Sequence, residues 1–196
     1  MPKRKVKFIS GGYYHLYNRG AGRRSICYEA RNYHYLLRLL KKVSTECRLT
    51  VIAYCLLPNH YHWLIRQDDA IPAGRLPRRV FGSYSQAFNL AYNRSGTLFE
   101  GPYKAIAVET DDYLHHLCRY IHLNPVRHQL IAAPEDWPYS NYLEWLQLRP
   151  GTLVDHAFVR EHFGSSQGYQ AFVARYKTDQ LPPSDELGDY LDALEG

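Results

Sequence analysis

The stretch LTVIAYCLLPNHYHWLIR, residues 49–66, contains two runs of residues that favour β-strands. The runs cover residues 49–57 and 60–66, and the turn-forming pair Pro58-Asn59 separates them. Two such runs joined by a short turn predict a β-hairpin. We expect this hairpin at the centre of the fold, with the flanking elements arranged around it.

Strand and helix patterns alternate on both sides of this hairpin. Aromatic and β-branched residues with period-two alternation predict strands, and apolar residues at positions i, i+3, i+4 and i+7 predict helices. The expected elements are a strand at 13–20, a helix at 29–47, a loop at 67–76, a helix from about 79 to 92 and a strand at 103–109.

Another helix is expected directly after the last of these strands. Thr110 is a good N-cap, and Asp111 and Asp112 would occupy the positive end of the helix dipole. The helix should end near Asn124, because Pro125 disfavours helical geometry at the residue before it.

The predicted order β-α-β-β-α-β-α fits an α+β fold, a ferredoxin-like antiparallel sheet with helices on one face. Residues 1–145 would form this main domain, and 146–196 a small C-terminal extension. The extension shows helical patterns at 155–163 and 167–177. It ends in an acidic tail, because residues 179–196 contain six acids and no Lys or Arg.

The composition limits the classes of protein to consider. The chain has 196 residues, and 24 Lys and Arg against 19 Asp and Glu give a net charge of +5, which suits a polyanionic partner. Without a long apolar run or a secretory signal, we expect a cytoplasmic protein and no membrane contact. The four cysteines form no C-x-x-C pair and are expected as buried thiols. Tyr is unusually common, at 18 against 7 Phe.

A pair of histidines, His60 and His62, lies within the second strand of the hairpin. Strand side chains alternate between faces, so both imidazoles point one way and Tyr61 points the other. The two could bind one metal ion or simply be hydrogen-bonded histidines. A binuclear H-x-H-x-D hydrolase is excluded, since the position that needs the acid is Leu64.

Tyr120 and Asn124 are four residues apart on the expected 110–124 helix and therefore lie on the same helix face. They flank an apolar stripe that should pack on the sheet, so polar groups at its edge can meet the sheet face. The simpler interpretation is a packed tyrosine and a C-terminal amide cap.

Basic residues gather in three expected loops, where Arg suits phosphate contacts and Tyr or Trp can stack on unpaired bases. For any one of these cations, a solvated surface is the simpler interpretation. The expected groups are Arg19, Arg23 and Arg24; Arg75, Arg78 and Arg79; and Arg94 with Lys104.

The ordered motifs LPNHYHWLI and, some sixty residues later, RYIHLNPVR resemble the single-tyrosine transposases of the IS200 group. YNRGAGRR, LFEGPYKAI and WPYSNY support the resemblance, which covers roughly residues 11–145. The match is closer to the branch of REP-associated tyrosine transposases. These proteins are HUH endonucleases, which implies the HUH variant of the fold named above.

The resemblance implies a site and a reaction for this chain. His60, His62 and Asn124 would bind Mg²⁺ or Mn²⁺, and Tyr120 would be the nucleophile. Tyr120 would attack a phosphodiester of single-stranded or hairpin DNA, form a 5′-phosphotyrosine and release a 3′-hydroxyl. The DNA would be bound by Arg127 of the NPVR motif and by six of the loop cations, Arg19, Arg23, Arg24, Arg78, Arg94 and Lys104. His122 and His116 are candidates for the group that accepts the phenol proton.

Two other hypotheses remain open from the sequence. The chain could be a regulator that binds hairpin DNA or RNA without cleaving it, or a protein with a structural zinc ion. The sequence also leaves open whether the chain is a monomer or a homodimer.

Overall fold

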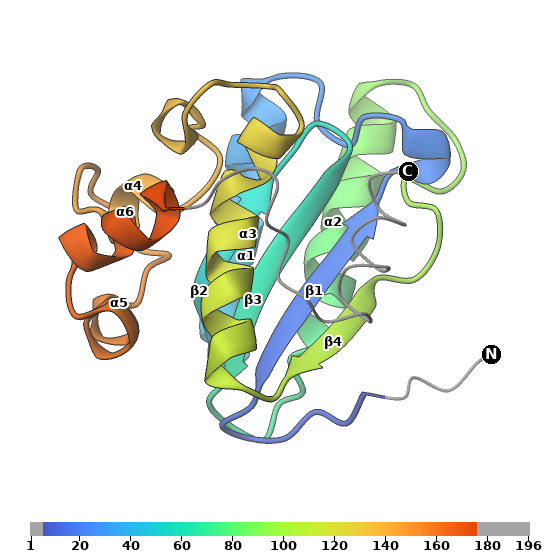
Figure 1. The fold of residues 1–196 in the computed structure, drawn as a ribbon. Helices are drawn as coiled ribbons and strands as arrows, with labels where there is room; N and C mark the ends of the chain where they lie inside the picture. Colours follow the sequence, from blue (N-terminus) through green and yellow to red (C-terminus); the bar gives the residue numbers. More distant parts are fainter. Residues whose placement is uncertain (1–5, 176–196) are drawn as a thin grey trace.

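The fold is built on a four-stranded antiparallel sheet (Figure 1), and the computed structural model describes residues 6–175. The predicted acidic tail and the first five residues lie outside the described residues. The strands are β1 (Tyr13–Arg19), β2 (Leu49–Leu56), β3 (His60–Gln67) and β4 (Lys104–Val108), in the order β2-β3-β1-β4. This is the predicted ferredoxin-like order, with β2 and β4 at the edges.

The predicted hairpin is confirmed, but only its strand β3 is central, because β2 lies at the edge of the sheet. β2 and β3 pair antiparallel around the Pro58-Asn59 turn, with Leu56 opposite Tyr61 and Cys55 opposite His62. On its other side β3 pairs with β1, which aligns Tyr17 with His62. The strand that carries the two histidines is therefore central in the sheet and fixed by a ladder on both edges.

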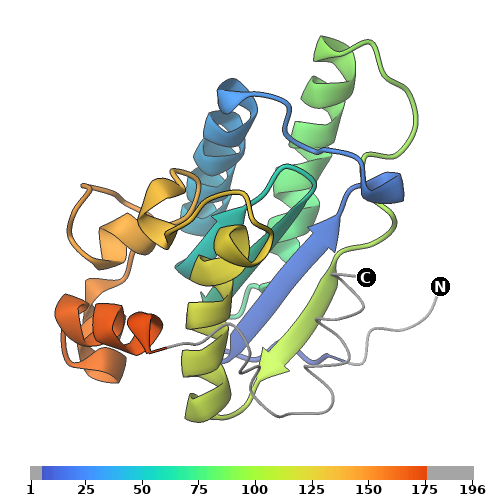
Figure 2. The ribbon, with the colours of Figure 1, turned by 45° about the horizontal axis from the view of Figure 1, so that its top comes forward.

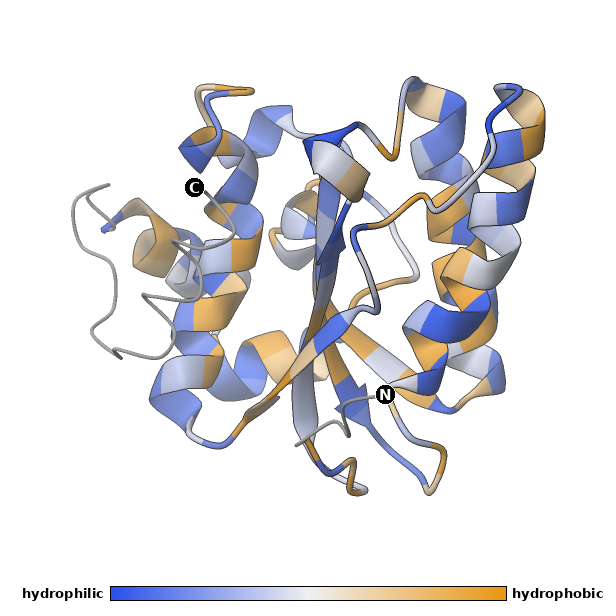
Figure 3. Ribbon diagram, turned by 90° about the vertical axis from the view of Figure 1, so that its right-hand side faces the viewer, coloured by the Kyte–Doolittle hydropathy of each residue, from blue (hydrophilic) through white to orange (hydrophobic). Residues whose placement is uncertain are grey.

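Helices cover both faces of the sheet, whereas the sequence predicted helices on one face. α1 (Ala30–Glu46) and α2 (Arg75–Ala91) pack on one face, and α3 (Asp111–Arg127) packs on the other. Figures 2 and 3 show the sheet between these two layers. The reason lies in β3, where Trp63 and Ile65 are buried toward α1 and α2 while Leu64 is buried toward α3. A sheet that is apolar on both faces needs a layer on each.

Two helix boundaries differ from the predictions. α2 begins at Arg75, because a proline such as Pro77 is compatible with the first turn of a helix. The basic residues Arg75, Arg78 and Arg79 are therefore helical and do not belong to a loop. α3 continues through Pro125 to Arg127, since a proline in the last turn removes only one hydrogen bond of the helix.

The C-terminal helices pack beside α3 and share its core. They are α4 (Tyr142–Trp145), α5 (His156–Phe163) and α6 (Ser166–Ala174), and short 3₁₀ turns lie at Ala21–Arg23 and Pro134–Asp136. Trp145, Phe158 and Tyr169 are buried in one cluster with Ile121 of α3. The boundary between domains at residue 145 stays a prediction. No helix among the described residues is long and apolar enough to cross a membrane.

Candidate active site

The strand β3 and the helix α3 bring the four predicted catalytic and metal-binding residues together. His60 and His62 both point toward α3, and their rings lie 5.2 Å apart, edge to face. Tyr61, between them, lies in the core on the opposite face of the sheet. Nε2 of His60 is 3.0 Å from Oδ1 of Asn124, which is fully buried.

Tyr120 completes this group from one helical turn before Asn124. Its ring meets the ring of His62 edge-on at 5.3 Å and is 8% exposed. The guanidinium of Arg127, a predicted DNA-binding residue, lies 5.3 Å from the centre of the same ring. The phenol of Tyr120 is therefore packed against the imidazole of His62 and lies beside the positive charge of Arg127.

The polar atoms of this site fit a divalent cation. Oδ1 of Asn59 lies 2.7 Å from Nδ1 of His60 and can only accept, so Nδ1 carries the proton. The lone pair on Nε2 then faces Oδ1 of Asn124, a second acceptor. A cation shared by the two atoms, or a reversed Asn124 amide, would satisfy this pair. The same cation could also bind the buried Nε2 of His62, which has no hydrogen-bond partner among the described residues.

The donor set would be mixed. Among the described residues, no group of three His, Cys, Asp or Glu side chains is placed to hold an ion. An amide oxygen from Asn124 would therefore have to complete a set begun by His60 and His62. Imidazole favours zinc or copper, whereas amide oxygen suits magnesium, manganese or calcium, so the donor types do not select one metal.

His15 of β1 is a site residue that the sequence analysis missed. Its Nε2 lies 2.9 Å from Nδ1 of His62, and the two rings stack at 5.1 Å. Tyr17 stacks on His15 at 4.8 Å and on His62 at 5.9 Å, so the three rings form one group. If Nδ1 of His62 donates to His15, the lone pair of His62 is directed to Nε2, the atom left for a metal. The alternation of side chains in β1 places His15 and Tyr17 on the same face of the sheet. Their proximity to His62 depends on the register between β1 and β3, which the sequence does not show.

The histidines of this region are held neutral by burial. Burial lowers the pKa of His15 to about 3 and the pKa of His60 to about 4, and it places the pKa of His62 well below its ordinary value. On α3, burial likewise lowers the pKa of His122 to about 4. Neutral imidazoles are the forms that bind metal and accept hydrogen bonds.

This burial predicts a loss of stability in mild acid. Histidines in the unfolded chain take up protons near pH 6.5, whereas His15 and His122 in the folded chain stay neutral to about pH 3 and 4. Their contribution is fully present above pH 6.5 and falls as the pH drops toward 4. Together they should lower the free energy of unfolding by about 3–4 kcal/mol between pH 7 and pH 5.

Urea unfolding at pH 7, 6 and 5, followed by circular dichroism, measures this slope. The matched control is His34→Ala, which removes an exposed histidine of α1 and should leave the slope unchanged. Equal stability at pH 7 and pH 5 would contradict the expected proton uptake on unfolding.

Arg23 lies near the site at the end of β1. It lines a cavity of about 260 Å³ together with His60 and His128. The ring of His128 lies 4.8 Å from the ring of His60. Arg24 follows in the chain and is exposed. Both arginines are therefore at the end of the sheet where β3 begins.

Lys104 is another predicted cation close to the histidines. Its ammonium group lies 6.0 Å from the ring centre of Tyr17, which in turn stacks on His62 at 5.9 Å. Lys104 and Arg127 thus bring positive charge to two rings that contact His62, those of Tyr17 and Tyr120.

Three other predicted cations contact different parts of the molecule. Nε of Arg19 forms an ion pair with Glu100 at 3.0 Å. Arg78 lies on α2 and lines a cavity on the opposite face of the sheet. Arg94 lies 5.5 Å from the ring centre of Phe88. The structure therefore divides the predicted DNA-binding set between two faces.

Residues 8–124 match the family model described as "Transposase IS200 like". This match covers more than half of the chain, so the protein belongs to the family of IS200-like transposases.

Within this class the similarity is to REP-associated tyrosine transposases, as the motifs predicted. The chain is 28% identical over 112 residues to the REP-associated tyrosine transposase of Escherichia coli strain K12, covering 56% of this chain. The matched stretch is 64% of that relative, which is less than two thirds of its length.

A solved structure supports the fold. It is described as a REP-associated tyrosine transposase bound to a REP hairpin, and it aligns with a TM-score of 0.62 and 24% sequence identity. The alignment covers 79% of this chain and 94% of that chain. The predicted α+β fold is thereby confirmed.

Proposed function

We propose that the protein is a metal-dependent endonuclease and strand transferase that acts on single-stranded DNA containing hairpins. The observation that carries the proposal is the meeting of His60, His62 and Asn124 beside the ring of Tyr120. Membership of a transposase family supports the reaction class. A relative bound to a hairpin supports this type of substrate.

The chemistry would use Tyr120 as a nucleophile. Its oxygen would attack phosphorus and form a 5′-phosphotyrosine, while the bond from phosphorus to the 3′ oxygen breaks and that oxygen leaves as a 3′-hydroxyl. A later 3′-hydroxyl of DNA could reverse the exchange and join strands. A divalent cation held by His60, His62 and Asn124 would supply charge stabilisation of the phosphate oxygens.

The two histidines considered as proton acceptors do not suit that role. His122 is buried with Nδ1 2.6 Å from the hydroxyl of Tyr169 and Nε2 2.9 Å from Oδ1 of Asn141, so both ring nitrogens are engaged. Nδ1 of His116 accepts from Arg119 at 2.7 Å. The neighbouring charge of Arg127 would instead help Tyr120 by stabilising a phenolate.

Metal removal tests the proposal. With a single-stranded hairpin oligonucleotide and Mn²⁺ or Mg²⁺, we expect cleavage products on a denaturing gel, and chelation should abolish them. His62→Ala should lower the cleavage rate at least about 100-fold, because a direct ligand matters more than its supporting partner. It should also weaken Mn²⁺ binding measured by calorimetry. His34→Ala, on the exposed face of α1, is the matched control.

Cleavage that persists unchanged in chelator would refute the metal dependence. Tight hairpin binding with no cleavage under any metal would favour the silent regulator. Zinc that stays bound through chelation, with unfolding on its removal, would favour a structural zinc site.

A further inference from the structure

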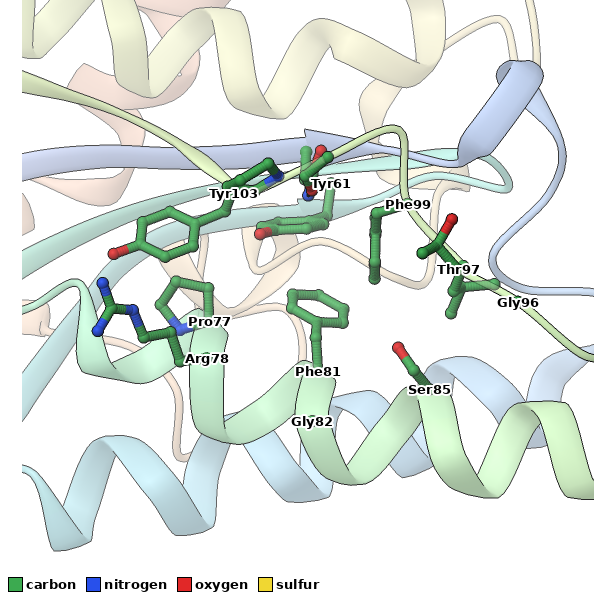
Figure 4. A pocket seen from close by; sticks show the side chains of 14 residues that line it. Tyr61, Pro77, Arg78, Phe81, Gly82, Ser85, Gly96, Thr97, Phe99 and Tyr103 are labelled. Atoms are coloured by element: carbon green, nitrogen blue, oxygen red, sulfur yellow. The ribbon is translucent and has the colours of Figure 1, made fainter. Parts of the chain in front are cut away.

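A second cavity lies on the face of the sheet opposite to His60 and His62. It has a volume of about 540 Å³ and lies between α2 and the segment 96–103 that leads into β4. Figure 4 shows aromatic rings around it and the guanidinium of Arg78 beside them. Its aromatic lining residues are Tyr61, Phe81, Phe99 and Tyr103.

The walls of this cavity are fixed by the protein itself. The backbone N–H of Glu100 donates to the carbonyl of Arg19 at 3.0 Å, and that of Ala21 donates to the carbonyl of Leu98 at 3.0 Å. The amide of Asn18 donates to the carbonyl of Gly101 at 2.9 Å. The segment is therefore bonded to the end of β1, and the cavity exists before any ligand binds.

Gly82 has no side chain to fill the cavity that it lines. It lies in the middle of α2, where glycine weakens a helix relative to alanine. A Cβ atom at Gly82 would meet no atom within 4 Å, so packing does not require a glycine there. The missing side chain leaves room in the cavity that Gly82 lines.

We propose that this cavity binds one unpaired base of single-stranded DNA, with a neighbouring phosphate on Arg78; this rests on the proposed function. The planar rings of Phe99 and Tyr103 offer surfaces on which a base stacks, above the buried ring of Tyr61, which already stacks on Phe81. Arg78 is the one charged residue among the described lining residues, and arginine suits a phosphate. If the ligand were an apolar side chain of another protein, it would make no ionic contact with Arg78.

The edge strand β4 connects this cavity with the candidate active site. Tyr103 lines the cavity, whereas the next residue, Lys104, lies over Tyr17 on the face that carries His62. Consecutive residues of a strand point to opposite faces. A single strand of DNA passing around the β4 edge would therefore meet a stacking ring on one face and a cation on the other.

The test measures DNA binding with a filled cavity. Gly82→Leu places a side chain in the space, and Ser83→Leu places the same side chain at an exposed position of α2 that does not line the cavity. The ligand is a hairpin oligonucleotide with a single-stranded tail, titrated in chelator to prevent cleavage, together with a series carrying one abasic site at each tail position.

For the wild type and for Ser83→Leu, an abasic site at one tail position should weaken binding about 10-fold, as expected for loss of one stacked base. Gly82→Leu should bind the intact oligonucleotide about 10-fold more weakly and should not distinguish that abasic site. Its melting temperature should equal or exceed that of the wild type, which shows that the variant is folded.

Wild-type affinity in Gly82→Leu, or no sensitive position in the abasic series, would overturn the inference while cleavage by Tyr120 could still stand. If the wild type neither binds nor cleaves any single-stranded oligonucleotide, the proposed function fails as well. The two failures are therefore distinguishable.

Discussion

Tyr120→Phe should abolish DNA cleavage and the covalent protein–DNA adduct while leaving the fold intact. The substitution removes only the oxygen that would attack phosphorus, and we expect the cleavage rate to fall at least about 1,000-fold, as when a covalent nucleophile is removed. The phenylalanine ring can keep the edge-on contact with His62 and the position under Arg127, each at 5.3 Å. A denaturing gel shows cleavage, and a shift in protein mass shows the adduct.

The matched control is Tyr113→Phe. Tyr113 lies on the same helix, two turns before Tyr120, and its buried hydroxyl has no hydrogen-bond partner in the described structure. Its replacement should leave cleavage within about twofold of the wild type, because it removes no hydrogen bond and keeps the packed ring. An adduct that forms normally in Tyr120→Phe would identify another residue as the nucleophile.

The parts of the site that lie close in sequence could be predicted from it. The period of two in a strand places His60 and His62 on one face, and the period of 3.6 in a helix places Tyr120 and Asn124 on one face. Which faces meet was not fixed by these periods. The family resemblance supplied that pairing, and the structure shows the two faces in contact where Nε2 of His60 lies 3.0 Å from Oδ1 of Asn124.

The residues that the sequence analysis missed depend on contacts between distant segments. His15 reaches His62 because β1 and β3 pair antiparallel, and the register of that pairing is set by tertiary packing. The layer of helices on each face was missed for a similar reason. Burial on both sides of β3 becomes evident only when α3 is placed over it.

The side chain of Asn141 connects the helix α3 with the edge strand β2. Its Nδ2 donates to the carbonyls of Ile52 and Leu153 at 2.8 and 3.0 Å. Its Oδ1 accepts from the backbone N–H of Tyr54 at 2.8 Å and lies 2.9 Å from Nε2 of His122. Since Oδ1 can only accept, Nε2 of His122 carries the proton. The other ring nitrogen of His122 then accepts from the hydroxyl of a tyrosine in α6, Tyr169.

Asn141→Ala should therefore cause the largest loss of stability among these variants. It would remove the partner of three polar groups: the backbone N–H of Tyr54, the Nε2–H of His122 and the carbonyl of Leu153. The carbonyl of Ile52 would still accept from the indole N–H of Trp145 at 3.0 Å. Each unsatisfied group costs about 1–3 kcal/mol, and neighbouring losses are not additive, so we expect a total near 4–6 kcal/mol. Because domains are stable by only about 5–15 kcal/mol, this is a large part of the free energy of unfolding. Urea unfolding followed by circular dichroism measures it.

Asn89→Ala is the control for Asn141→Ala, since Asn89 donates one exposed hydrogen bond to the carbonyl of Gly96. It should cost less than about 1 kcal/mol, the value of one ordinary hydrogen bond. A cost below 1 kcal/mol for Asn141→Ala as well would show that water or rearranged neighbours replace the network. If the network holds α3 on the sheet, Asn141→Ala should also lose DNA cleavage at temperatures where most of the protein is still folded, because Tyr120 and Asn124 depend on the position of that helix.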